Sequence, residues 1–226
     1  MQRRQFTTGG VVLAAAGPGL VWAAFGEADA AQAVRVALER GANAAVDQLG
    51  RADGFLGNPQ VRIPLPGALN SAAKLLKATG QQKQVDALVT AMNRAAEAAV
   101  PQARKLLVST AKSISVDDAI KIVRGGDTSV TDYFAGKTRA PLAEQFLPIV
   151  TQATEKVDLA SQYNAVAGQA AQFGLLKGDE VNVQRYVTAK SLDGLFLMIG
   201  EEEKKIRADP LKTGSAILKK VFGSLK

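Results

Sequence analysis

Two glutamates near the C-terminal end of the chain have a spacing that places one of them at the protein core. Apolar residues at helical spacing lead up to Ile199, and Glu202 and Glu203 follow it by three and four residues. Side chains at these intervals share one face of a helix, so one carboxylate lies in or beside the core. A buried carboxylate is costly unless a cation neutralises it. We therefore expect a structural ion pair with an arginine or lysine from elsewhere in the chain, such as Arg94 or Arg62; a ligand-binding or catalytic carboxylate is the alternative.

A second polar group follows one face of a long predicted helix. Asn93, Arg94 and Glu97 lie beside an apolar stripe, and their variety is typical of a buried network or a binding site. The segment from Gly54 to Pro66 is rich in glycine and proline, which predicts an ordered connection packed through its apolar residues. An interhelical pocket is the usual ligand site of a helical bundle, so we expect binding where this segment, the three polar residues and Tyr133 meet.

Histidine and cysteine are both absent from the sequence, which narrows the possible chemistry. Ser-His-Asp triads, Cys-His pairs, the usual zinc sites and c-type haem attachment all require one of them. We therefore expect no metal site and no cofactor. If the protein is an enzyme, the remaining titratable groups favour a hydrolase that uses two carboxylates as general acid and base.

Two short motifs look catalytic but lack the rest of their patterns. Ser71 and Lys74, together with Lys212 to Gly214, match elements of penicillin-binding proteins, yet neither a Ser-x-Asn element nor a predicted edge strand accompanies them. Gly136 to Thr138 resembles the end of a phosphate-binding loop, but Thr131 stands where that loop needs glycine. We interpret the first match as a chance occurrence of common residues, and the second as a glycine turn and a threonine cap between helices.

Residues 1–30 have the layout of an export signal. Arg3, Arg4 and Phe6 form a partial twin-arginine pattern, and a weakly apolar stretch separates them from Ala28 and Ala30, which suit a signal peptidase. We expect twin-arginine export, cleavage after Ala30 and a periplasmic mature protein. The alternatives are the ordinary secretory route and a retained membrane anchor, although the apolar stretch is shorter than the ~18 to 20 residues that span a bilayer.

The formal net charge of +7 belongs to the mature domain, because residues 1–30 contain two arginines and two acidic residues. A positive exported protein meets anionic membrane surface or cell-wall polymer. The sequence has no basic cluster with interleaved aromatic residues, so we expect no nucleic-acid partner. Membrane-surface contact through Ile217 to Phe222 is an alternative, and packing of that segment into the core is favoured.

Helical periodicity dominates residues 31–226, and strand-like alternation is almost absent. A chain of this length forms one domain. We predict an all-α, irregular single-domain bundle of about eight or nine helices. The expected helices cover residues 31–49, 67–79, 81–113 with a kink or break at Pro101, 115–125, 128–134, 138–157, 159–173, 182–190, 191–208 and 213–225.

Several separate segments resemble a known bacterial family. They are residues 54–66, 92–101, 117–119, 125–127, 133–134, 193–196 and 201–210. In this order they are similar to the family called domain of unknown function 4197, and the similarity covers nearly the whole mature chain. The resemblance implies an exported or lipid-anchored helical protein without an established activity. The lipoprotein cysteine that the family implies is absent from this chain, so a lipid anchor is excluded.

The sequence thus predicts a soluble periplasmic protein that acts by binding. Its partner is either an envelope protein or an apolar small molecule held between helices. A carboxylate-based hydrolase of the cell envelope is the competing hypothesis.

Overall fold

Eight α-helices and three short 3-10 turns form in the part of the chain that the computed structural model describes, namely residues 26–67, 73, 80, 82–172 and 178–224. No strand occurs among these residues, so the predicted all-α fold is confirmed. The helices are α1 (Glu27–Leu49), α3 (Gln82–Ala99), α4 (Ala103–Lys112), α5 (Val116–Arg124), α6 (Ser129–Thr154), α7 (Asp158–Gln172), α8 (Val183–Ala208) and α9 (Ala216–Gly223), and the 3-10 turns are η2 (Val100–Gln102), η3 (Gly178–Val181) and η4 (Pro210–Thr213).

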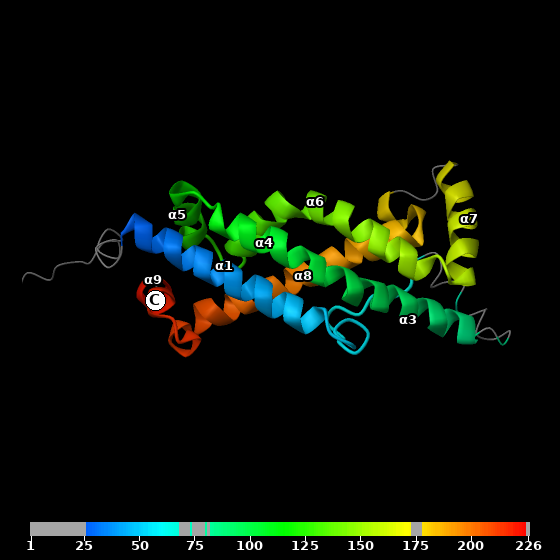
Figure 1. The fold of residues 1–226 in the computed structure, drawn as a ribbon, viewed down its shortest axis with the longest axis horizontal. Helices are drawn as coiled ribbons and strands as arrows, with labels where there is room; N and C mark the ends of the chain where they lie inside the picture. Colours follow the sequence, from blue (N-terminus) through cyan, green and yellow to red (C-terminus); the bar gives the residue numbers. More distant parts are fainter. Residues whose placement is uncertain (1–25, 68–72, 74–79, 81, 173–177, 225–226) are drawn as a thin grey trace, which may run out of the picture.

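The long helices run along the length of the molecule, with α7 across one end and α5 and α9 at the other (Figure 1). The most extensive contacts join α6 with α8, α1 with α8, α3 with α6 and α1 with α4. Helices α6 and α8 are antiparallel, because Glu203 contacts Val130 near one end of the pair and Gln184 contacts Thr154 near the other. This pair forms one side of the bundle.

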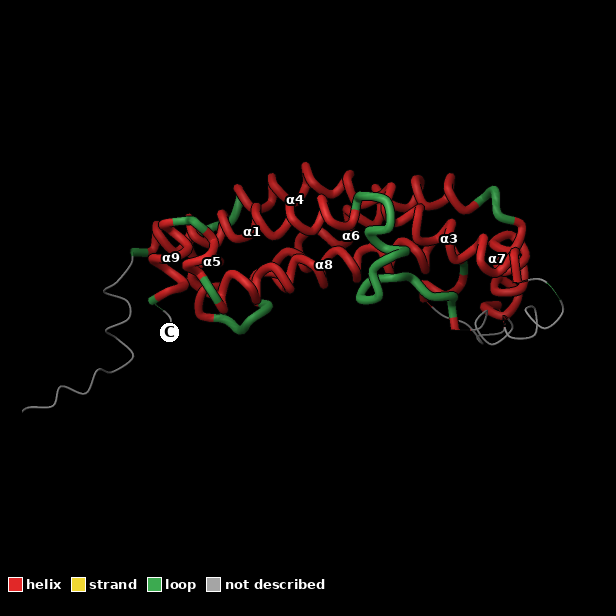
Figure 2. Tube along the Cα trace, turned by 90° about the horizontal axis from the view of Figure 1, so that it is seen from below, coloured by secondary structure: helices red, strands yellow, loops and turns green. Residues whose placement is uncertain are grey.

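The connection between α1 and α3 packs against the bundle, as its apolar residues predict. Figure 2 shows it as a loop lying along the side of the helices. Phe55, Ile63 and Leu65 are buried. The ring of Phe55 rests on α8 at Gly194, where an added Cβ would lie 2.8 Å from the ring. A larger residue at that position would push the loop away from the helix.

Two predicted helix breaks do not occur. Residues 128–134 and 138–157 were expected as separate helices, as were 182–190 and 191–208, but α6 and α8 are each continuous. Thr138 and Ser191, with which the second helix of each pair was expected to begin, instead donate their hydroxyls to the carbonyls of Phe134 and Val187, four residues earlier. Because the hydroxyl finds its hydrogen-bond partner on the preceding turn of the same helix, the residue fits inside a continuous helix and does not mark the start of a new helix.

Other boundaries agree with the sequence patterns. Pro101 divides the helix predicted over 81–113 into α3, η2 and α4. Ser115 caps α5, accepting a hydrogen bond from the Asp118 amide. Leu218, Val221 and Phe222 of α9 are buried, as core packing of that segment requires. The helix predicted over 67–79 lies mostly outside the described residues.

The predicted export signal, residues 1–30, overlaps the start of α1. Arg3, Arg4 and Phe6 lie outside the described residues. Ala28 and Ala30 belong to the first turn of α1, Ala30 is fully buried, and the Asp29 carboxylate lies 2.5 Å from the Lys220 ammonium of α9. Cleavage after Ala30 stays a prediction, and it would remove this first turn. None of the described helices has the length and apolar character needed to cross a membrane.

Candidate functional site

Glu203 is the buried member of the glutamate run, with 4% of its surface exposed. Its carboxylate accepts hydrogen bonds from the amides of Val130 (3.1 Å) and Thr131 (3.0 Å) and from the Thr131 hydroxyl (2.9 Å). Helix α6 begins at Ser129, so these amides belong to its first turn and have no partner within the helix. Glu203 therefore caps α6 from another helix, at the end where the helix dipole favours negative charge.

Arg207 completes this arrangement. Its Nε donates to Glu203 at 3.0 Å, and Nη2 donates to the Ile122 carbonyl and the Ser129 hydroxyl at 3.1 and 2.8 Å. The guanidinium also lies 5.0 Å from the centre of the Phe222 ring. Arg207 thus joins α8 to the end of α5, the start of α6 and α9. We call Glu203 and Arg207 the helix cap.

The expected ion pair of a buried glutamate is confirmed, but its predicted partners are wrong. Arg207, four residues further along α8, meets Glu203, while Arg94 and Arg62 lie elsewhere. Helical neighbours at this interval share a face. Glu202 is more exposed and pairs with Lys205 at 2.6 Å.

Glu97 has a parallel role on α3. It is 5% exposed, and one carboxylate oxygen accepts the amides of Phe55 (3.0 Å) and Leu56 (3.1 Å). The other oxygen lies 2.6 Å from Arg94, which also reaches Asp53 at 2.8 Å. Hydrogen bonds to Glu97 and then to Asp53 raise the pKa of Arg94 above its ordinary value.

Asn93 holds the same loop at a second point. Its side chain is fully buried; Oδ1 accepts the Ile63 amide at 2.8 Å, while Nδ2 donates to the carbonyls of Ile63 and Val89 at 3.0 and 2.8 Å. The amide group thereby supplies both bonds that a neighbouring strand would offer to Ile63. We call Asn93, Arg94 and Glu97 the loop clamp.

Other predicted site residues lie apart from the loop clamp. Arg62 belongs to the loop, but it is exposed. Tyr133 is half-buried on α6 and donates a long hydrogen bond of 3.4 Å to Asp118 of α5, and burial raises the pKa of its hydroxyl. Helix α5 and the loop stand at different places along the bundle (Figure 1). The structure therefore gathers Asn93, Arg94 and Glu97 with the loop, and it does not bring Tyr133, Glu202 or Glu203 to them.

The carboxylates of the helix cap and the loop clamp are bound by groups of the protein itself. Each buried carboxylate already accepts two backbone amides and a guanidinium. An acid or base needs an oxygen that can reach a reacting atom. Within the described part of the chain, no three or more acidic side chains gather in a way that could hold a metal ion.

An open groove between α6 and α8 is the feature that sequence reasoning missed. Its wider part has a volume of about 540 Å³, and a continuation of about 350 Å³ runs toward the helix cap. Arg139 lines both parts and pairs with Asp193 across the groove. The wider part is lined by Ala135, Gly136, Arg139, Ala140, Ala143, Glu144, Leu147, Asp179, Arg185, Thr188, Ala189 and Leu192.

The groove exposes apolar surface in both of its parts. Leu147 and Leu197 are 38% and 43% exposed, and one lines each part. Thr188 is 5% exposed, and its hydroxyl has no hydrogen-bond partner among the described residues. The residues are individually ordinary, so only the outward spacing of small side chains on α6 could have indicated the groove from sequence.

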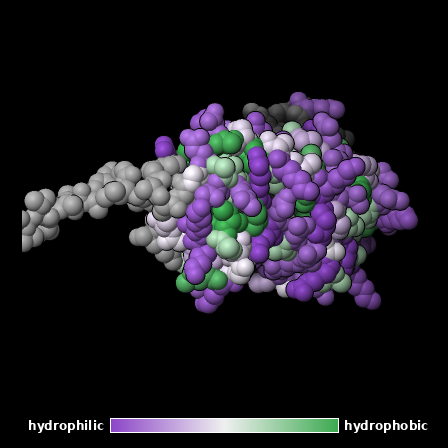
Figure 3. Space-filling view, turned by 60° about the vertical axis from the view of Figure 1, so that its left-hand side comes forward, coloured by the Kyte–Doolittle hydropathy of each residue, from purple (hydrophilic) through white to green (hydrophobic). Residues whose placement is uncertain are grey.

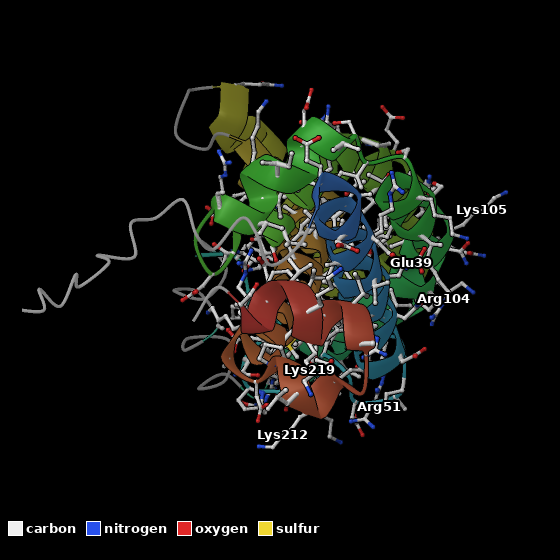
Figure 4. The ribbon with its side chains drawn as sticks, turned by 90° about the vertical axis from the view of Figure 1, so that its left-hand side faces the viewer. Glu39, Arg51, Arg104, Lys105, Lys212 and Lys219 are labelled. Atoms are coloured by element: carbon white, nitrogen blue, oxygen red, sulfur yellow. The ribbon has the colours of Figure 1, made fainter. Side chains whose placement is uncertain are left out.

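A second hollow, between α1 and the end of α8, has a different character. It measures about 860 Å³, and charged residues of both signs line it. Several of them are already paired: Lys205 with Glu202, Lys212 with Asp209, and Arg40 with the Thr213 carbonyl. In the end-on view of Figure 4, Lys105 and Lys212 project outward from the bundle, and on the face in Figure 3 hydrophobic side chains form small patches separated by hydrophilic ones. Neither observation marks this end as a binding surface.

Comparison with known proteins identifies the family of this chain. Neither a curated protein nor a solved structure matches the chain. Residues 24–223 match the sequence profile of the family described as "Protein of unknown function (DUF4197)". The match covers the helix cap, the loop clamp and the α6–α8 groove together. The chain therefore belongs to the family of proteins of unknown function DUF4197.

Proposed function

We propose that this protein is a periplasmic interaction protein without catalytic activity, and that its α6–α8 groove binds an α-helix of a protein partner. The observation that carries the proposal is the groove itself. Two long antiparallel helices form its walls, small residues form much of its floor, and Leu147 and Leu197 expose apolar surface along it. Helix-in-groove recognition uses the same elements.

The shape of the groove favours a helix over an enclosed small molecule. Its lining extends along α6 from Thr128 to Leu147, which is roughly 28 Å at 1.5 Å per residue. An apolar small molecule is usually buried over most of its surface, whereas this groove is open. Arg139, Glu144, Asp179 and Arg185 give its wider part polar edges, as the rims of protein interfaces have.

The carboxylates support a role without catalysis. Glu97 and Glu203, the acids that a hydrolase would need in a protected site, are occupied by backbone amides and arginines. They sit in separate clusters on α3 and α8. Both oxygens of each carboxylate accept hydrogen bonds from the protein itself.

Export rests on the N-terminal pattern. Arg3, Arg4 and Phe6 precede a weakly apolar stretch, and this layout is typical of twin-arginine signals. Changing both arginines to lysine should stop export, and the protein should then accumulate in the cytoplasm. Undiminished periplasmic protein in that variant would contradict the proposed route.

Site-specific photo-crosslinking in intact cells tests the binding surface. A photoreactive residue at position 147 or 197 should give a discrete crosslinked product. Val116 and Leu211 are matched controls, because they are also exposed large apolar residues and do not line the groove. Products from the control positions alone, or equally from all four, would contradict the proposal.

A further inference from the structure

We propose that the helix in the groove comes from a second copy of this chain, which pairs through the outward face of α6 in an antiparallel two-fold dimer. This inference rests on the proposed function, because it names the occupant of the same groove. It is carried by the order of residues on α6, by their sizes and by their charges.

A narrow seam runs along the outward face of α6. It consists of Gly136, Ala140, Ala143 and Leu147, all of which line the groove. The steps between them are four, three and four residues, the spacing by which helices pair in coiled coils. The steps are the same from either end, so antiparallel pairing can match the seam with itself.

The sizes of the seam residues fit that pairing. A two-fold axis between Ala140 and Ala143 places these two residues opposite each other, and it places Gly136 opposite Leu147 of the second copy. Apart from its chain neighbours and the nearby backbone of α6, no atom lies within 4 Å of the position that a Cβ on Gly136 would occupy, and Leu147 is 38% exposed. A large exposed side chain therefore meets an open space, and small residues at the centre allow the helices to approach closely.

The charges beside the seam fit as well. Lys137 and Glu144 are exposed on one flank of the seam, seven residues apart. In an antiparallel pair the same flanks of the two helices meet, so Lys137 comes beside Glu144 of the second copy, and symmetry repeats the pair. Within the described chain, neither side chain forms an ion pair.

Sedimentation analysis of the full chain tests the dimer through Gly136→Leu. The Cβ of the new side chain has open space around it in the monomer, and leucine has a higher helix propensity than glycine, so the melting temperature should not fall. It should collide with Leu147 of the second copy and raise the dimer dissociation constant by about tenfold or more. Gly136→Leu combined with Leu147→Ala exchanges the large and small partners, and it should restore association. Gln145→Leu is the matched control, because Gln145 is exposed on α6 but does not line the groove.

Disulfide crosslinking tests the orientation, and the absence of native cysteine removes background. A mixture of Gly136→Cys and Leu147→Cys chains should form a crosslinked heterodimer. Leu147→Cys alone should not crosslink, because the two copies of position 147 lie roughly 16 Å apart along the axis. Crosslinking of Leu147→Cys with itself would indicate parallel pairing and overturn the inference.

Two outcomes separate this inference from the proposed function. A wild-type chain that sediments as a monomer at all concentrations, or dimers unaffected by Gly136→Leu, would overturn the second copy as occupant. If positions 147 and 197 then still crosslink to another protein in cells, the proposed function stands. If they do not, both fail.

Discussion

The helix cap and the loop clamp use the same residue types for different tasks. In each, a buried glutamate accepts two consecutive backbone amides and pairs with an arginine on its own helix. The cap binds amides of a helix start, and its Arg207 side chain is only 13% exposed. The clamp binds amides of a loop, and its Arg94 side chain is 42% exposed.

This difference in exposure determines what each cluster contributes. Arg207 contacts α5, α6 and α9. Loss of the Glu203 carboxylate would therefore leave the positive charge of Arg207 shielded from water between these three helices, without its partner. Arg94 keeps contact with water and with Asp53. A charge next to water is stabilised by solvent, so its partner matters less. We expect the cap to stabilise the whole bundle and the clamp to stabilise mainly one loop.

The largest effect should come from Glu203→Gln. The amide keeps one oxygen for the start of α6 but leaves Arg207 without its counter-charge, which should lower the free energy of unfolding by about 3 kcal/mol. Urea denaturation followed by circular dichroism measures this. Glu202→Gln is the control, since Glu202 pairs only with Lys205 at the surface; its effect should stay within about 0.5 kcal/mol. Equal effects of the two changes would remove the distinction between them.

Glu97→Gln should have an intermediate effect of about 1.5 kcal/mol. Arg94 retains Asp53 and solvent, so the remaining cost is the weaker acceptor for the Phe55 and Leu56 amides. Hydrogen exchange should accelerate at these two amides and remain unchanged at Val130 and Thr131. Faster exchange throughout the bundle would show that the clamp, like the cap, acts globally.

Asp53→Gly should have the smallest effect. Asp53 has a left-handed backbone with φ of 62° and a side chain that is 64% exposed. Glycine relieves the backbone strain but loses a surface ion pair, and the two contributions oppose each other at about 1 kcal/mol each. The free energy of unfolding should therefore change by less than about 0.5 kcal/mol. Asp53→Ala keeps the strain and loses the pair, so it should be the less stable of the two; the reverse order would refute this explanation.

Much of the fold followed from the sequence, because helical periodicity reports which face is buried. The packing of Phe55, Ile63 and Leu65 was predictable because they are the apolar residues of a connection rich in glycine and proline, and the division at Pro101 because proline interrupts a helix. The continuity of α6 and α8 was not, since it depends on whether the hydroxyls of Thr138 and Ser191 point back along their own helices. Side-chain direction at such positions is decided by packing.

The candidate site was less predictable. Sequence spacing indicated a buried carboxylate at Glu202 or Glu203. The amides that this carboxylate binds belong to residues 130 and 131, which are 73 and 72 positions away in the sequence. Contacts between residues so far apart form only in the folded chain, so a local pattern cannot predict them. The α6–α8 groove combines alanine, glycine and leucine with charged residues such as Arg139, on helices that were predicted as fragments. These residues form no recognisable motif in the sequence, so only their arrangement in space reveals the groove.

Hydrogen exchange of the wild-type chain at low and high protein concentration tests most directly the claim that buried carboxylates hold the fold while the groove binds a second copy of the chain. At high concentration, protection should increase in peptides covering residues 135–147 of α6 and 185–197 of α8. Peptides covering the loop clamp and the helix cap should exchange at the same rate in both samples. Protection that changes at the loop of residues 53–66, or nowhere, would contradict the account.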